Sequence, residues 1–172
     1  MTTSFRGRAL AVSIAGAAAA ACFSFALPAE AQSVTIVDRR HERTVAANSD
    51  IVRMRVTNTS DALTATVKLR RFDAKSRVML VFSQTGESTF YSAFAGRRAK
   101  SPRLLALGPR GDFAPQDCRD LGVTRVRRGV RFTIPKSCLA GDPTATVNAS
   151  ALTEKPSGAD QDVTRSRAVR AD

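Results

Sequence analysis

The chain has 172 residues, a formal net charge of +12 from 27 Lys and Arg against 15 Asp and Glu, and no tryptophan. This length suits one domain with a hydrophobic core. The positive charge favours acidic polymers, acidic glycans or lipid head groups as partners, with a strength that salt reduces. A single histidine, with two of the three cysteines expected to form a disulfide, argues against a zinc site.

The N-terminal segment has the layout of a secretory signal. Arg6 and Arg8 precede a long apolar run, Pro28 ends that run, and Ala29-Glu30-Ala31 forms a small-x-small cleavage site. We therefore expect residues 1–31 to be a signal peptide, and the protein to be secreted, extracellular or associated with the cell envelope. No later stretch approaches the ~20 apolar residues of a membrane-spanning helix, so none is expected after cleavage. Cleavage would remove two arginines and Glu30, which leaves a net charge of +11.

Two cysteines remain after that cleavage. Outside the cell, Cys118 and Cys138 meet an oxidising environment, and they are predicted to form one structural disulfide. The third, Cys22, follows three alanines, as a lipid-modified cysteine does, but the apolar run continues past it to a better cleavage site.

Alternating side chains predict a first hairpin over residues 51–70. Met54 and Val56 fall on one face with Val52, while Arg53, Arg55 and Thr57 fall on the other, and residues 58–61 form a polar turn. In the returning strand, residues 63, 65, 67 and 69 face inward. The expected register pairs Val56 with Leu63 and Met54 with Ala65.

Further strands follow in chain order. Residues 78–82 are apolar on both faces and predict a central strand covered on two sides, and residues 89–95, 101–108 and 144–152 are also read as strands. In the 89–95 strand, Phe90 and Phe94 fall on one face, which is expected to pack in the core, and Tyr91 falls on the other. Residues 109–115 are read as a loop. Residues 123–134 predict a hairpin with a three-residue loop, Arg127-Arg128-Gly129, in which Gly129 takes the left-handed conformation.

Short strands separated by turns predict an all-β fold, an antiparallel jelly-roll-like β-sandwich that forms a single domain over residues 32–153 and contains one disulfide. From Glu154 to Asp172 the chain is polar and without period, and we expect a flexible tail.

The order of several segments resembles a known group of proteins. An Asp-Ile strand start at residue 50, the Val-Lys-Leu-Arg-Arg-Phe strand, the Cys-Arg-Asp-Leu loop and the Ile-Pro-Lys-Ser-Cys-Leu stretch are similar to small secreted β-sandwich proteins of high-GC Gram-positive bacteria. The layout is also loosely like extracellular sandwich modules that bind sugars or haem. The resemblance covers residues 50–152, implies the sandwich fold and brings no catalytic motif with it.

Enzyme motifs are missing from the sequence. His41 is the single histidine, and the sequence has no Gly-x-Ser-x-Gly motif whose serine it could activate in a Ser-His-Asp triad. We therefore expect no catalytic residue, metal site or cofactor. Asp112, Asp117 and Asp120 cluster near Cys118, so an extracellular hydrolase or lyase that uses loop carboxylates remains an alternative. Calcium bound by the same loop oxygens is a further alternative.

The most distinctive expected surface is basic. Arg53, Arg55, Lys68 and Arg70 share the outward face of the first hairpin, and arginine forks suit phosphate and carboxylate groups. The sequence therefore predicts a non-catalytic binding or envelope-associated protein that contacts an anionic wall polymer or glycan through this face. Export and a lack of surface aromatic residues argue against nucleic acid. A protein–protein module that presents Arg127 and Arg128 is the other alternative, and the oligomeric state stays open.

Overall fold

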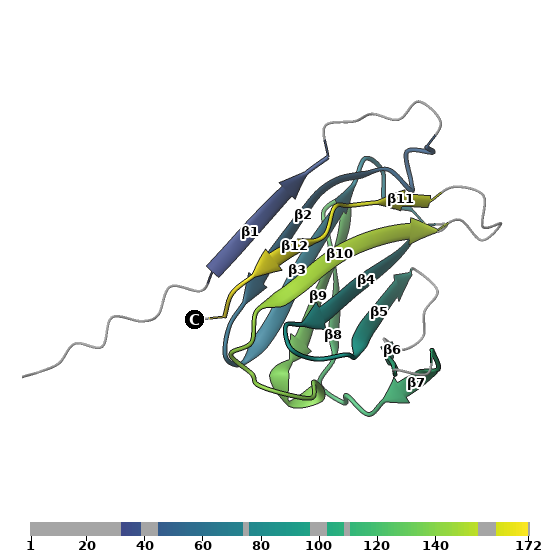
Figure 1. Cartoon of the computed structure of the whole chain (residues 1–172). Coiled ribbons are helices and arrows are strands. Elements are labelled where there is room, and N and C mark those ends of the chain that lie inside the picture. The colour runs from purple at the N-terminus through teal and green to yellow at the C-terminus, as the bar shows by residue number, and fades with distance from the viewer. Residues whose placement is uncertain are drawn as a thin grey trace, which may run out of the picture.

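The computed structural model describes residues 32–38, 45–73, 76–96, 103–108, 111–154 and 161–171. The predicted signal peptide and His41 lie outside these residues. The described chain forms two antiparallel sheets that pack face to face (Figure 1).

The first sheet contains five strands in the order β1-β2-β3-β9-β8. Three of its pairings join neighbours in sequence, whereas β3 and β9 come from distant parts of the chain. The bounds are β1 Gln32–Val37, β2 Ile51–Asn58, β3 Ala62–Leu69, β8 Gly122–Val126 and β9 Gly129–Pro135.

The second sheet follows the order β11-β10-β4-β5-β6-β7, and β12 also pairs with β10. The β4 to β7 strands form a meander, and β10 returns to lie against β4. The bounds are β4 Arg77–Gln84, β5 Phe90–Gly96, β6 Arg103–Leu107, β7 Phe113–Gln116, β10 Val147–Glu154, β11 Gln161–Val163 and β12 Arg167–Val169.

The core lies between the sheets and is built from alternate residues of their central strands. Met54 and Leu63 of the first sheet and Leu80 of the second are fully buried. The alternation read from the sequence arises from the two-residue repeat of a strand, in which every second side chain meets the opposite sheet. The predicted all-β antiparallel sandwich is therefore confirmed.

The first hairpin keeps its predicted faces but differs in register. Met54 pairs with Val67 and Val56 with Ala65, a shift of two residues from the expected pairing, and an even shift leaves every side chain on the same face. A bulge between Ile51 and Arg53 changes one position. Ile51 enters the core in place of Val52, which is only half-buried.

The predicted disulfide is present. Cys118 and Cys138 are joined, with their Cα atoms 5.3 Å apart. Cys138 ends a short 3₁₀ helix, η1 (Lys136–Cys138), directly after β9, and Cys118 lies before β8. The bridge thus closes the β8–β9 hairpin at its base.

The C-terminal segment differs from the expected flexible tail. In the described residues 161–171, β11 and β12 both pair with β10, and Val169 and Asp162 are buried. The segment folds because a few of its residues are anchored individually, although it has no sustained period. Asn58 donates its side-chain amide to the Val169 carbonyl, and the Arg170 N–H donates to Gln32 of β1.

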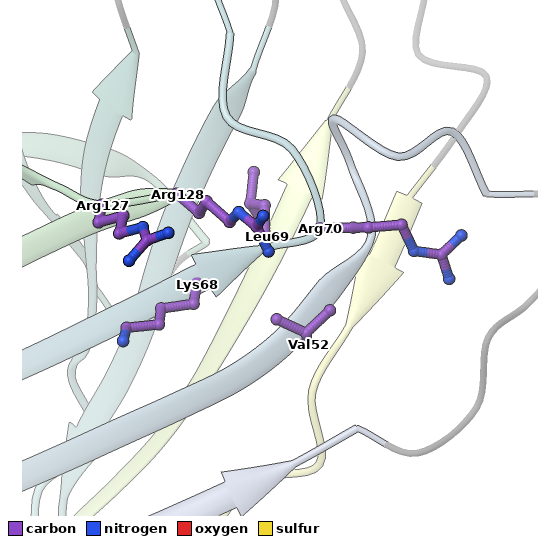
Figure 2. Close-up of a pocket in the computed structure, with 6 residues that line it drawn as sticks. All are labelled: Val52, Lys68, Leu69, Arg70, Arg127 and Arg128. Carbon is purple, nitrogen blue, oxygen red and sulfur yellow. The ribbon is translucent and has the colours of Figure 1, made fainter.

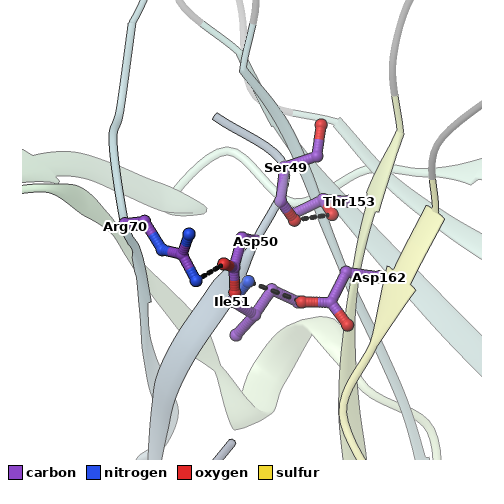
Figure 3. A network of polar contacts seen from close by, with 6 residues as sticks. All are labelled: Ser49, Asp50, Ile51, Arg70, Thr153 and Asp162. Carbon is purple, nitrogen blue, oxygen red and sulfur yellow. Dashed lines mark hydrogen bonds and ion pairs between the residues drawn. The ribbon is translucent and has the colours of Figure 1, made fainter. Parts of the chain in front are cut away.

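Asp162 anchors β11 to the start of β2. Its carboxylate accepts a hydrogen bond from the Ile51 N–H at 2.6 Å, and Thr153 of β10 donates to the Ser49 carbonyl nearby (Figure 3). Burial raises the pKa of Asp162, and the negative charges of Asp38 and Asp50 act in the same direction. The sandwich therefore encloses a carboxyl group that would be easier to accommodate uncharged.

Within the described part of the chain, no helix is long and apolar enough to cross a membrane.

Candidate anion-binding face

The outer face of the first sheet is made of three cross-strand rows. Val34, Ile36 and Val123 pack against the core, so their neighbours on β1 and β8 point outward. The first row is Val37, Arg53, Lys68, Gly129 and Val126; the second is Thr35, Arg55, Thr66, Arg131 and Thr124; the third is Ser33, Thr57, Thr64, Thr133 and Gly122.

These rows combine cations with hydroxyl groups. Four of the side chains are cationic and seven are Ser or Thr, while none is acidic and none is aromatic. Neighbouring strands lie about 4.8 Å apart and alternate residues about 6.6 Å apart, so the groups form a shallow lattice. We call these three rows the basic face.

Two of the arginines on this face make side-chain hydrogen bonds across strands. The Arg55 Nε–H donates to the Ser33 hydroxyl at 2.9 Å, and the Arg131 Nε–H donates to the Thr66 hydroxyl at 3.3 Å. Both bonds use Nε, which leaves the terminal nitrogens of each guanidinium as donors for a ligand.

The other two cations oppose each other. Arg53 and Lys68 are direct cross-strand partners, and like charges in this relation destabilise a sheet. In the described residues, no ion pair joins either side chain to a carboxylate. A bound anion would relieve this repulsion.

The structure places Arg70 differently from the other three predicted site residues. It follows β3, and its guanidinium forms an ion pair with the buried Asp50 at 2.6 Å (Figure 3). Arg53, Arg55 and Lys68 do share the outward face, as expected. Arg70 instead neutralises the internal carboxylate of Asp50, so its own positive charge is largely compensated.

A pocket of about 330 Å³ adjoins the basic face at the tip of the β8–β9 hairpin. It is lined by Val52, Lys68, Leu69, Arg70, Arg127 and Arg128. Figure 2 shows the Arg70 guanidinium pointing away from the other three cations. Lys68, Arg127 and Arg128 have no acidic partner among the described residues, so the pocket carries an uncompensated positive charge.

The hairpin tip differs from its prediction. Val126 pairs with Gly129, so the loop has two residues, and Arg128 takes the left-handed conformation with φ 59°. A left-handed arginine costs more than a glycine there. A residue of this kind at a turn is a reason to look for a function of its side chain.

Gly129 is needed for close packing and not for the predicted left-handed conformation. A Cβ atom built on Gly129 would lie 2.0 Å from the Val67 carbonyl oxygen, which no side chain tolerates. The missing side chain lets β9 begin directly against β3, where the Leu69 N–H donates to the Arg128 carbonyl at 2.8 Å. This contact fixes Arg127 and Arg128 beside Lys68.

The loop carboxylates form no comparable arrangement. Asp112, Asp117 and Asp120 are all exposed, and Asp117 lies 3.8 Å from the Arg119 guanidinium. In the part of the chain that the structure describes, no three His, Cys, Asp or Glu side chains gather as a metal site.

One buried cation lies away from the basic face. Lys136 of η1 is buried, and its Nζ has no hydrogen-bond partner in the described structure. Burial lowers the pKa of Lys136, and the negative charge of Asp142 offsets part of this effect. Hydrogen bonds from Thr144 lower the pKa of Asp142 in turn.

Sequence reasoning missed two features of the surface. Arg131 and the hydroxyl rows belong to the basic face, but the pairing of β3 with β9 that assembles them is not visible in local patterns. Phe90 and Phe94 were expected in the core and Tyr91 on the opposite face. The structure reverses them, with Phe90 50% exposed, Phe94 37% exposed and Tyr91 buried against Phe82.

Compared with known proteins, the chain matches no family model, and no curated protein is significantly similar to it.

Proposed function

We propose that the chain is an exported, non-catalytic binding protein that holds an anionic glycan or a similar polyhydroxylated wall polymer against the basic face. The observation that carries the proposal is the composition of that face. Four cations and seven hydroxyl groups lie in three adjacent rows without a carboxylate among them.

The two kinds of side chain suit the two kinds of group on such a polymer. Guanidinium groups bind carboxylate or phosphate through paired hydrogen bonds. Threonine hydroxyls both donate and accept, which matches the hydroxyl groups of a sugar or polyol. The shallow lattice would contact several units of an extended chain.

Other polymers fit this face less well. Neutral sugars usually stack on an aromatic ring, and the three rows contain none. Single-stranded nucleic acid also relies on aromatic stacking in addition to charge. The predicted signal peptide supports an acidic polymer outside the cell as the partner.

The test is retention of the purified protein on an immobilised polyuronate, measured as a function of salt. Arg53→Ala, Arg55→Ala and Lys68→Ala in one variant remove three charges from the basic face. The matched control removes three exposed charges elsewhere, with Arg165→Ala, Arg167→Ala and Arg170→Ala. We expect the first variant to elute at much lower salt than the control.

A second variant separates glycan binding from simple ion exchange. Thr57→Val and Thr64→Val keep the shape and β propensity of the face but remove two hydroxyl groups. Retention on polyuronate should fall, while retention on a sulfonate cation exchanger should stay unchanged. If the triple variant of the basic face and its triple control lose the same amount of retention on polyuronate, the proposal is refuted, because net charge alone would then explain the binding.

A further inference from the structure

The outer face of the second sheet is apolar, unlike the basic face. Its three cross-strand rows are Val163, Leu152, Met79, Phe94 and Arg103; Ser150, Val81, Ser92, Leu105 and Pro115; and Asn148, Ser83, Phe90, Leu107 and Phe113. We call these rows the apolar face. The sequence predicted that 78–82 would be covered on both sides, yet Met79 and Val81 are only half-buried.

The exposed apolar area of this face reaches the size of the largest patch on a typical soluble protein. Phe90, Phe94 and Phe113 are 50%, 37% and 58% exposed, and Val163 is 50% exposed. Because a phenylalanine presents about 150–250 Å², these three rings alone leave roughly 300 Å² open to solvent. Half-buried Met79, Val81, Leu105, Leu107 and Leu152 lie among them and extend the patch. Patches of this size on soluble proteins are often functional.

The area also fits a specific contact between two proteins. Three rows about 6.6 Å apart, each crossing five strands at the usual spacing, give a face of roughly 500 Å² in projection. Two such faces in contact would bury about 1,000 Å² or more in total, which is where specific interfaces begin.

Charged residues at the two ends of the apolar face are complementary. Arg77 begins β4 and Arg103 begins β6, so both lie at one end of the meander. Glu87 lies in the turn between β4 and β5 and Asp112 directly precedes β7, which places both at the other end. All four are exposed, and none is in an ion pair within the described residues.

We propose that the apolar face binds a second copy of this chain. The two copies would pack face to face about a two-fold axis in the plane of the contact, with their strands antiparallel. This operation brings Arg103 of each copy toward Asp112 of the other. The alternative axis along the strands would bring arginine against arginine, so the charges select one of the two arrangements.

The net charge of the chain supports this contact over others between copies. Two molecules of the same large positive charge repel each other, and contact through the basic faces would bring their uncompensated cations together. The apolar face carries its few charges at the ends in opposite signs. A pair joined there keeps the two basic faces on opposite outer sides.

The test is the oligomeric state of the purified protein, measured by light scattering and sedimentation over a dilution series. We expect a dimer that dissociates on dilution. Phe90→Ser with Phe94→Ser should give a monomer with an unchanged circular dichroism spectrum, because both rings are exposed. The matched control is Val37→Ser, which replaces a 49% exposed apolar residue on the basic face and should leave the dimer intact.

Charge reversal tests the predicted orientation. Arg103→Glu alone should weaken the dimer about tenfold, since each change acts twice across a two-fold contact. Adding Asp112→Lys should restore it. A wild-type protein that stays monomeric at high concentration would overturn the proposal, and so would a dimer that survives the phenylalanine variant. Failure of the double reversal to restore the dimer would overturn the proposed pairing.

Discussion

Gly129 offers the sharpest test of how the hairpin tip is held. In Gly129→Ala the new Cβ would lie 2.0 Å from the Val67 carbonyl oxygen and 3.0 Å from the Lys68 Cα. Both contacts are with backbone, so no side-chain rotation relieves them. The start of β9 must lift from β3 by about 1 Å or more, since normal contacts lie beyond 3 Å.

The cost follows from what that movement breaks. The Leu69 N–H donates to the Arg128 carbonyl at 2.8 Å, and Lys68 pairs with Gly129 in the same corner. Loss of one or two such hydrogen bonds costs about 1 kcal/mol each, and backbone displacement in a packed region costs about 1–3 kcal/mol. We expect the free energy of unfolding to fall by about 2–5 kcal/mol.

Urea denaturation of wild type and variant measures this difference. The matched control is Gly122→Ala in the paired strand, where the atom nearest to the added Cβ would be the Thr133 Cβ at 3.3 Å and the effect should be small. The melting temperature of Gly129→Ala should drop by about 6–15 °C. If Gly129→Ala lies within 1 kcal/mol of wild type, or matches Gly122→Ala, the close approach does not constrain the hairpin.

Two buried ionisable groups give predictions with opposite pH dependence. Because the pKa of Asp162 is raised in the folded state, its charge destabilises the fold at neutral pH, and this penalty disappears as pH falls through the folded pKa. The free energy of unfolding of Asp162→Asn should therefore exceed that of wild type at pH 7, and the difference should become smaller on acidification. Asp162→Ala leaves the Ile51 N–H without an acceptor and should lower the free energy of unfolding by about 1–3 kcal/mol. An Asp162→Asn advantage that grows toward low pH would contradict the argument. Because the pKa of Lys136 is lowered by burial, the penalty of its charge is present below the folded pKa and is lost as pH rises toward the unfolded value. Lys136→Met should raise the free energy of unfolding near pH 7, and this increase should become smaller at alkaline pH. Chemical denaturation at both pH values measures the difference. A loss of stability at pH 7 would show that the ammonium group is paired.

The two-residue repeat was sufficient to predict which side of β2 and of β3 is buried. Arg53 and Arg55 point outward as expected, and the two-residue error in hairpin register did not matter because it preserves the faces. The bulge at Ile51 was not predictable in the same way. Ile51 and Val52 are both β-branched and apolar, and only the packing of the opposite sheet selects Ile51 for the core.

The errors occur where a pattern is compatible with two environments. Strands β4 to β6 are apolar on both sides, so the sequence could not distinguish an apolar face in the core from one on the surface. Phe90 and Phe94 were assigned wrongly for this reason. The basic face could be predicted only in part. Arg53, Arg55 and Lys68 come from one hairpin, whereas Arg131 joins them through the pairing of β3 with the distant strand β9.

The interleaving of the two sheets has a consequence for how the polypeptide reaches this state. Sheet formation needs β3 to find β9 and β4 to find β10, and in each case several intervening strands must be accommodated. Topologies dominated by such distant pairings acquire their native order on the millisecond to second scale, not in microseconds. During that interval the doubly apolar strands of nascent molecules are open to one another, and mutual repulsion between strongly cationic chains is then a safeguard against aggregation.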